Sequence, residues 1–127
     1  LRPAELAADL GVALLGDGAF GFHAAELDTA ARCGLPFVAV VGNDACWNAE
    51  YQLRLAAYGA ARAQGCGLAP TRYDLVAVAL GGHGEHVTRV EDLSGALARA
   101  FAAGRPACVN VTIDGLPAPT MARTRAP

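Results

Sequence analysis

The sequence predicts an α/β domain, built as a three-layer sandwich around a mostly parallel sheet. Its 127 residues match the size of one domain, and 54% of them are hydrophobic while 17% are charged. Apolar runs that are too continuous to face water, as in parallel sheets, alternate with segments of helical periodicity. The main apolar runs end in glycine or polar residues, as strands do at their exits.

The first third of the chain predicts two helix–strand pairs. A short helix is expected over 3–10, followed by a buried strand over 11–15 that stops at Gly-Asp-Gly. Apolar positions at helical spacing predict a helix over 22–33, which Gly34 ends. A continuous apolar strand is then expected over 36–43, with both of its faces covered.

The remaining chain continues the alternation. The expected elements are a weakly patterned helix over 47–59, a loop over 65–71, a helix over 71–80, a break over 81–84, a short strand over 85–90, an amphipathic helix over 91–104 and a buried strand over 107–114. One domain over 1–116 and a Pro-rich tail over 117–127 account for the whole sequence. Because the first residue is not Met, we expect a fragment of a longer multidomain chain.

Composition excludes several kinds of function. All ten basic residues are Arg, which excludes a Schiff-base lysine and a Walker lysine, and Ser94 lacks the elbow of a serine hydrolase. A net charge of −2 without a basic run argues against nucleic-acid binding, and no apolar run is long enough to predict a membrane span. The spacing of Cys33, Cys46, Cys66 and Cys108 predicts free thiols in a cytoplasmic protein.

Two strand exits carry the candidate chemistry. Residues 16–21, GDGAFG, satisfy the dinucleotide pattern G-x-G-x-x-G after a strand. Asp17 lies inside this pattern, and a carboxylate repels a pyrophosphate unless a cation lies between them. Mg²⁺ commonly bridges carboxylates to phosphates, and the next strand exit supplies Asn43 as a further oxygen ligand. Each feature alone has an ordinary explanation, because Gly-Asp turns and Asn caps are common.

The two features together resemble the signature of thiamine-diphosphate-dependent enzymes, a GDG turn followed by Asn. The resemblance continues through 16–44, the NAEYQ segment, 71–93 and 105–115, and it is to the C-terminal diphosphate-binding domain of the acetolactate-synthase-like branch. In that family the metal is held by the Asp, the Asn and the main-chain oxygen two residues further on. These positions are Asp17, Asn43 and Ala45.

The resemblance implies the remaining site residues and the partners. The cofactor-binding set would be Gly16, Asp17, Gly18, Ala19, Phe20, Asn43, Ala45, Cys46 and Trp47, the first five of them through a phosphate-binding turn and the last two by folding over the diphosphate. It also implies an enzyme that cleaves or joins C–C bonds of 2-keto acids or acyl-CoA. A pyrimidine-binding domain would supply the activating Glu, usually from another subunit of a homodimer or homotetramer. We therefore assign no catalytic residue here and expect this segment alone to be inactive.

Two other functions stay open at this stage. A nicotinamide-binding Rossmann domain would use Asp44 on the ribose, although Asp17 fits that function poorly. In a receiver-like module Asp17 would be the residue that accepts a phosphoryl group, but such modules need a nearby Lys and this sequence has none. His83 and His86 lie among glycines that argue against a helical metal site. Glu26 is expected on a helix surface or in a buried hydrogen bond, and His23 is expected near the phosphates, either contacting the cofactor or simply exposed.

Overall fold

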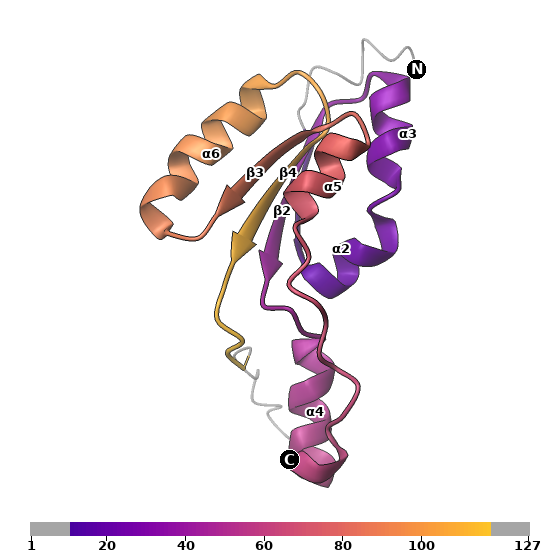
Figure 1. Ribbon diagram of the computed structural model, residues 1–127, viewed down its shortest axis with the longest axis vertical. Coiled ribbons are helices and arrows are strands. Elements are labelled where there is room, and N and C mark those ends of the chain that lie inside the picture. The colour runs from indigo at the N-terminus through magenta and orange to yellow at the C-terminus, as the bar shows by residue number, and fades with distance from the viewer. Residues whose placement is uncertain (1–10, 118–127) are drawn as a thin grey trace, which may run out of the picture.

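A computed structural model describes residues 11–117, which form a four-stranded parallel sheet between two layers of helices (Figure 1). The elements are β1 (Gly11–Gly16), α2 (Asp17–His23), α3 (Glu26–Cys33), β2 (Phe37–Asn43), α4 (Asn48–Tyr58), a 3₁₀ turn (Ala60–Arg62), α5 (Tyr73–Ala79), β3 (His83–Val87), α6 (Val90–Ala102) and β4 (Ala107–Thr112). The predicted helix over 3–10 and all but the first residue of the predicted tail lie outside the described residues.

The sheet has the order β1-β2-β4-β3, and every pair is parallel. Gly16 pairs with Gly42, and Asn43 pairs with Thr112, so the carboxyl ends of β1, β2 and β4 lie at one edge. Helix α4 lies beyond this edge, below the arrowheads of β2 and β4 in Figure 1. The predicted α/β class is therefore confirmed, and this edge is where a parallel sheet binds ligands.

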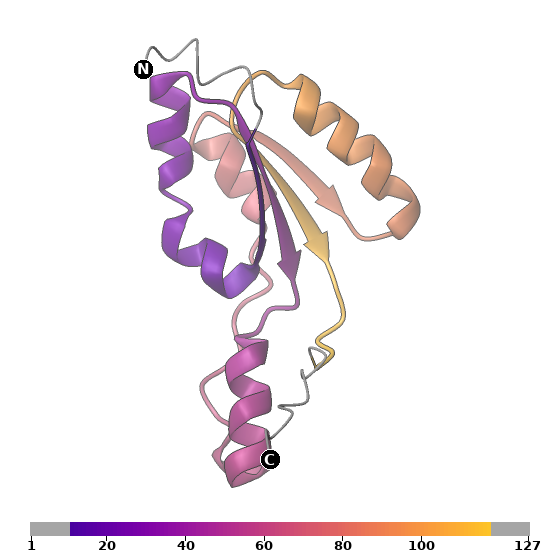
Figure 2. The ribbon, with the colours of Figure 1, turned by 180° about the vertical axis from the view of Figure 1, so that it is seen from behind.

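Each face of the sheet buries its own apolar cluster. Helices α2, α3 and α5 cover one face, and α6 covers the other, as the view from behind also shows (Figure 2). The first cluster consists of Phe20, Leu27, Ala39, Val41, Ala77 and Cys108, and the second of Val38, Val87, Ala96, Ala100, Ala107 and Val109. Alternate residues of β2 and β4 enter opposite clusters, which explains why these strands are continuously apolar.

The first strand is less buried than its sequence predicts. Val12 and Leu14 are 58% and 80% exposed, whereas their neighbour Leu15 packs against the first cluster. Among the described strands β1 pairs only with β2, and α6 packs over β3, β4 and β2. The apolar pattern correctly predicted a strand, but it did not reveal that this strand lies at the end of the sheet.

The helix predicted over 22–33 is wrong in its extent. The structure has two helices, α2 and α3, and α2 already begins at Asp17, directly after β1. Gly18, which is expected in the phosphate-binding turn over 16–20, and Gly21 both lie within α2. A Cβ atom at Gly21 would lie 3.0 Å from the Tyr73 hydroxyl, so this glycine serves close packing against α5.

The break predicted over 81–84 is too long, because only Gly81 and Gly82 form the turn after α5 and β3 begins at His83 rather than at 85. A Cβ atom at Gly82 would approach the Pro106 carbonyl to 2.7 Å, and one at Gly84 would collide with the carbonyl of Asp74. Helix α5 thus packs its backbone directly on β3, and glycine in a strand marks such close approach. The strand ends at Val87, three residues before the predicted end.

Two further predictions concern the cysteines and membrane spans. All four cysteines are free thiols, as their spacing predicted. Within residues 11–117 no helix is long and apolar enough to cross a bilayer.

Candidate functional site

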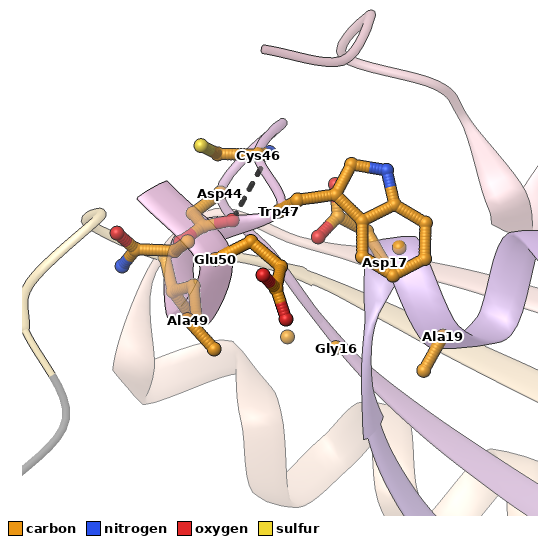
Figure 3. Close-up of a pocket in the computed structure, with 12 residues that line it drawn as sticks. Gly16, Asp17, Ala19, Asp44, Cys46, Trp47, Ala49 and Glu50 are labelled. Atoms are coloured by element: carbon orange, nitrogen blue, oxygen red, sulfur yellow. Dashed lines mark hydrogen bonds between the residues drawn. The ribbon is translucent and has the colours of Figure 1, made fainter. Parts of the chain in front are cut away.

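A cavity of about 340 Å³ lies where β1 and β2 end and α2 begins (Figure 3). We call it the first cavity. Six of the predicted cofactor-binding residues line it, namely Gly16, Asp17, Gly18, Ala19, Cys46 and Trp47. The other lining residues were not predicted as cofactor ligands from the sequence; they are Asp44, Gly42, Asn48, Ala49, Glu50 and Ile113. Of these, Asp44 entered the sequence analysis only as a ribose ligand of the nicotinamide-binding alternative.

Asp17 is the most unusual side chain of this cavity. It is 1% exposed, and its Oδ2 is the one buried side-chain nitrogen or oxygen within residues 11–117 that lacks a hydrogen-bond partner. Burial raises the pKa of Asp17; the main-chain amide of Gly18 opposes this effect, and the charge of Asp44 adds to it. Leaving a buried charged group unpaired is costly, so an atom of this kind indicates that a cation belongs beside it.

Trp47 lies over the start of α2. A Cβ atom at Gly18 would come within 2.9–3.1 Å of the indole ring, so only glycine lets the ring lie this close. The indole also contacts Phe22, one turn further along α2, with ring centroids 5.0 Å apart. Trp47 therefore forms a wall of the first cavity directly above the Gly-Asp-Gly sequence.

Asn43 and Ala45 open onto a second cavity of about 310 Å³. Asp44 and Ile113 line both cavities, which are therefore neighbours. The Asn43 Oδ1 accepts a hydrogen bond from the Ala45 amide at 3.1 Å, and the Ala45 carbonyl accepts one from the Leu68 amide at 2.7 Å. Both oxygens keep a second lone pair. The predicted metal ligands thus come from adjacent strand exits, but they line two neighbouring cavities rather than one.

The backbone at Ala45 is strained. Its φ of 54° makes it the only non-glycine residue with a positive φ among residues 11–117. Such conformations are costly for residues with a Cβ atom, and they cluster at ligand sites. The bridge between Cys46 and Gly67, with a bond of 2.8 Å from the Trp47 amide to the Cys66 carbonyl, holds this turn in place.

Several singled-out residues lie away from the cavities. The Phe20 side chain is buried in the core against Tyr73, at a ring distance of 5.1 Å, so only its main chain remains for the predicted role. His23 is the exposed last residue of α2, and Glu26 is the exposed first residue of α3. Neither lines the first or the second cavity.

The two histidines of β3 have separate local partners. His83 contacts Glu85 at 2.8 Å, and His86 contacts the Thr112 hydroxyl at 3.2 Å. Being three apart on a strand, they point to opposite faces. Within residues 11–117 no three His, Cys, Asp or Glu side chains gather around a common point. The ligand set predicted from the sequence is of another kind, since it joins one carboxylate to an amide oxygen and a main-chain oxygen.

The arrangement suits a hard divalent cation and a phosphate group. Carboxylate, amide and carbonyl oxygens are the ligands that Mg²⁺ takes in proteins, usually together with substrate phosphates. Gly18 and Ala19 line the cavity in the first turn of α2, where main-chain N–H groups have no partner within the helix. The orphaned Asp17 oxygen and the strained Ala45 turn therefore fit a bound metal–phosphate group.

Comparison with known proteins identifies relatives of this domain. Residues 3–111 match the family model described as thiamine pyrophosphate enzyme, C-terminal TPP binding domain. The chain is 49% identical over 104 residues to a probable acetolactate synthase of Mycobacterium bovis, covering 81% of this chain and 19% of that protein. It is 37% identical over 103 residues to 2-hydroxyacyl-CoA lyase 2 of Danio rerio, covering 77% and 16%.

Solved structures agree on the fold. A thiamine diphosphate-dependent 4-hydroxybenzoylformate decarboxylase of Rhodococcus jostii superposes with a TM-score of 0.76 at 23% identity, covering 83% of this chain and 20% of that one. Benzoylformate decarboxylase of Polynucleobacter necessarius gives the same TM-score at 18% identity. The chain spans about one fifth of the length of these proteins and of the acetolactate synthase.

Proposed function

Because this chain belongs to the thiamine pyrophosphate enzyme family, as its C-terminal TPP-binding domain, we propose that it binds the diphosphate of thiamine diphosphate through Mg²⁺. The observation that carries the proposal is the orphaned Asp17 Oδ2, buried at the exit of β1. In this proposal Asp17, the Asn43 amide oxygen and the Ala45 carbonyl hold the ion. When bound, the cofactor supplies the electron sink for cleaving or forming a C–C bond.

The remaining cavity residues hold the diphosphate in this proposal. Gly16, Gly18, Ala19 and the main chain of Phe20 lie at the β1–α2 junction, where free amides can donate to phosphate oxygens. Cys46 and Trp47 also line the first cavity. Burial raises the pKa of the Cys46 thiol, with Asp44 adding to the shift, so this cysteine stays protonated and acts as a wall rather than as a nucleophile.

We also propose the setting in which the domain works. The similarity to acetolactate synthase and 2-hydroxyacyl-CoA lyase suggests a parent enzyme acting on 2-keto acids or acyl-CoA, with a pyrimidine-binding domain supplying the activating Glu. The parent would be a homodimer or homotetramer. No described residue of the first cavity is assigned to catalysis, which agrees with a segment that forms only part of a cofactor site.

The site assignment is tested with the single tryptophan of the sequence, Trp47. Binding of Mn²⁺, used in place of Mg²⁺, should quench its fluorescence in the presence of thiamine diphosphate. Asp17→Asn should abolish this quenching, and Asp44→Asn should largely retain it. The nicotinamide-binding alternative predicts the opposite result. In that case Asp44→Asn would lose NAD binding, Asp17→Asn would retain it, and binding would not depend on metal.

A further inference from the structure

The amide of Asn43 is held in one orientation by its surroundings. Its Nδ2 donates to the Thr71 carbonyl at 2.9 Å and to the Asn110 Oδ1 at 3.1 Å. An amide nitrogen has two N–H groups, and both are used by these acceptors. The Asn43 Oδ1, which accepts only from the Ala45 amide among the described residues, is therefore the atom left available to a cation.

The orientation of Asn110 is fixed in turn. Its Nδ2 donates to the Asp74 Oδ1 at 3.2 Å, and the Arg72 guanidinium holds both Asp74 oxygens, at 2.9 and 2.6 Å. An ionised carboxylate can only accept hydrogen bonds. Asn110 must therefore turn its nitrogen towards Asp74, which leaves its oxygen for Asn43.

These contacts form a directional chain that starts at a carboxylate and ends at an amide oxygen. Asp74, Asn110 and Asn43 are 4%, 1% and 8% exposed, so water does not supply alternative partners to the middle of the chain. Reversing any amide would place two donors or two acceptors against each other, and buried mismatches of this kind are costly. The carboxylate of Asp74 thus orients Asn110, and Asn110 together with the Thr71 carbonyl orients the Asn43 amide at the strand exit.

Packing alone does not require these polar side chains. Asn110 is a polar residue in the middle of β4, between Val109 and Val111, and Asp74 in the first turn of α5 accepts a hydrogen bond from it. Apolar residues of similar volume often stabilise a core as well as buried polar groups do. The polar network at this place therefore serves a purpose other than stabilising the core.

We propose that Asn110 and Asp74 are positioning residues for the metal site, because they hold the Asn43 amide with its oxygen towards the bound divalent ion. Neither residue touches the ion in this account, and neither was singled out by the sequence. The inference rests on the proposed function, since it assumes that Asn43 is a ligand.

The test compares metal affinity across variants of the chain. Mn²⁺ binding in the presence of thiamine diphosphate is measured by electron paramagnetic resonance, and folding is checked by circular dichroism. Asn110→Leu removes the acceptor for the Asn43 amide at similar volume. The isosteric Asp74→Asn replaces a carboxylate, which can only accept hydrogen bonds, with an amide that can also donate to Asn110. Both should weaken Mn²⁺ binding by about 10–100-fold, as loss of outer hydrogen bonds does at metal sites. Thr112→Val is the matched control, because Thr112 lines the same cavity from β4 and its hydroxyl contacts His86 instead.

A double-mutant cycle separates positioning from general damage. In the Asn43→Ala background, Asn110→Leu should cause no further loss of Mn²⁺ affinity, because the group it orients is already absent. Equal additional loss in both backgrounds, or wild-type affinity in folded Asn110→Leu and Asp74→Asn, would overturn the inference and leave the proposed function standing. If Asn110→Leu fails to fold, Asp74→Asn decides alone. A wild-type chain that binds no Mn²⁺ would overturn the proposed function and this inference with it.

Discussion

Replacing Asp17 with Asn should stabilise the ligand-free chain while removing its response to metal and cofactor. Asp17 is 1% exposed, and its Oδ2 has no partner. Burial raises the pKa of this carboxyl, which means that the folded state holds the proton more tightly than the unfolded state. The stability that this protonation provides is full below the unfolded pKa of 3.8, and it is lost as the pH rises through the raised folded pKa. This carboxyl therefore makes the ligand-free wild-type chain less stable at neutral pH than at acidic pH.

The expected change in the free energy of unfolding on Asp17→Asn has opposite signs in the ligand-free and the ligand-bound chain. An unsatisfied buried polar atom costs about 1–3 kcal/mol, and Asn keeps part of that cost while losing the charge, so Asp17→Asn should raise the free energy of unfolding by about 1 kcal/mol. A ligand at 100 times its Kd stabilises a protein by about 2.7 kcal/mol. With saturating Mg²⁺ and thiamine diphosphate the wild-type chain should gain this amount and the variant none. The variant should then be less stable by about 1.7 kcal/mol.

Urea unfolding followed by circular dichroism measures both differences. The matched control is Asp44→Asn, because Asp44 lines the same cavity and its Oδ1 already accepts from the Cys46 amide at 3.2 Å. This control should keep most of the stabilisation by metal and cofactor. A ligand-free Asp17→Asn chain that is clearly less stable than wild type, or one that still gains stability from Mg²⁺ and thiamine diphosphate, would refute the assignment of Asp17 as a metal ligand.

Three further outcomes are expected. Gly18→Ala should displace the Trp47 ring and cost about 1–3 kcal/mol of stability, visible as a shift in tryptophan emission, whereas Gly67→Ala, which has open space around its Cα, should change neither. Amide hydrogen exchange over residues 44–67 should slow when Mg²⁺ and thiamine diphosphate are added, because no residue of α4 is buried in the chain itself; unchanged exchange would contradict this. The chain alone should neither decarboxylate pyruvate nor accelerate deuterium exchange at C2 of the cofactor, and faster exchange than in free cofactor would reveal a base within these residues.

Periodicity and glycine placement predicted most of the fold, and the exceptions have physical causes. Continuous apolar strands alternating with helices indicated a parallel sheet, because both faces of such strands must be covered. The same rule failed at Val12 and Leu14, since the position of a strand within the sheet depends on pairings that are distant in sequence. The sequence predicts Gly18 in a turn and Gly84 in a break, whereas each lies in a regular element and allows a neighbouring group to approach closely.

The candidate site was only partly predictable. Gly-Asp-Gly and Asn43 were found because their spacing and their places at strand exits are visible in the sequence. The roles of Asn110 and Asp74 could not be predicted from the sequence. Their hydrogen bonds with Asn43 and with each other depend on the sheet order, which places β4 beside β2. The shared lining of the two cavities by Asp44 and Ile113 depends on the same adjacency.

Calorimetric titration of the chain with thiamine diphosphate, in excess Mg²⁺ and in excess chelator, tests the central claim most directly. The diphosphate and the buried charge of Asp17 repel each other unless a cation lies between them, so binding should occur with Mg²⁺ and be lost with chelator. NAD should bind in neither condition. Equal affinity for thiamine diphosphate with and without metal, or tight binding of NAD, would contradict the proposal that this domain holds its cofactor through a metal ion.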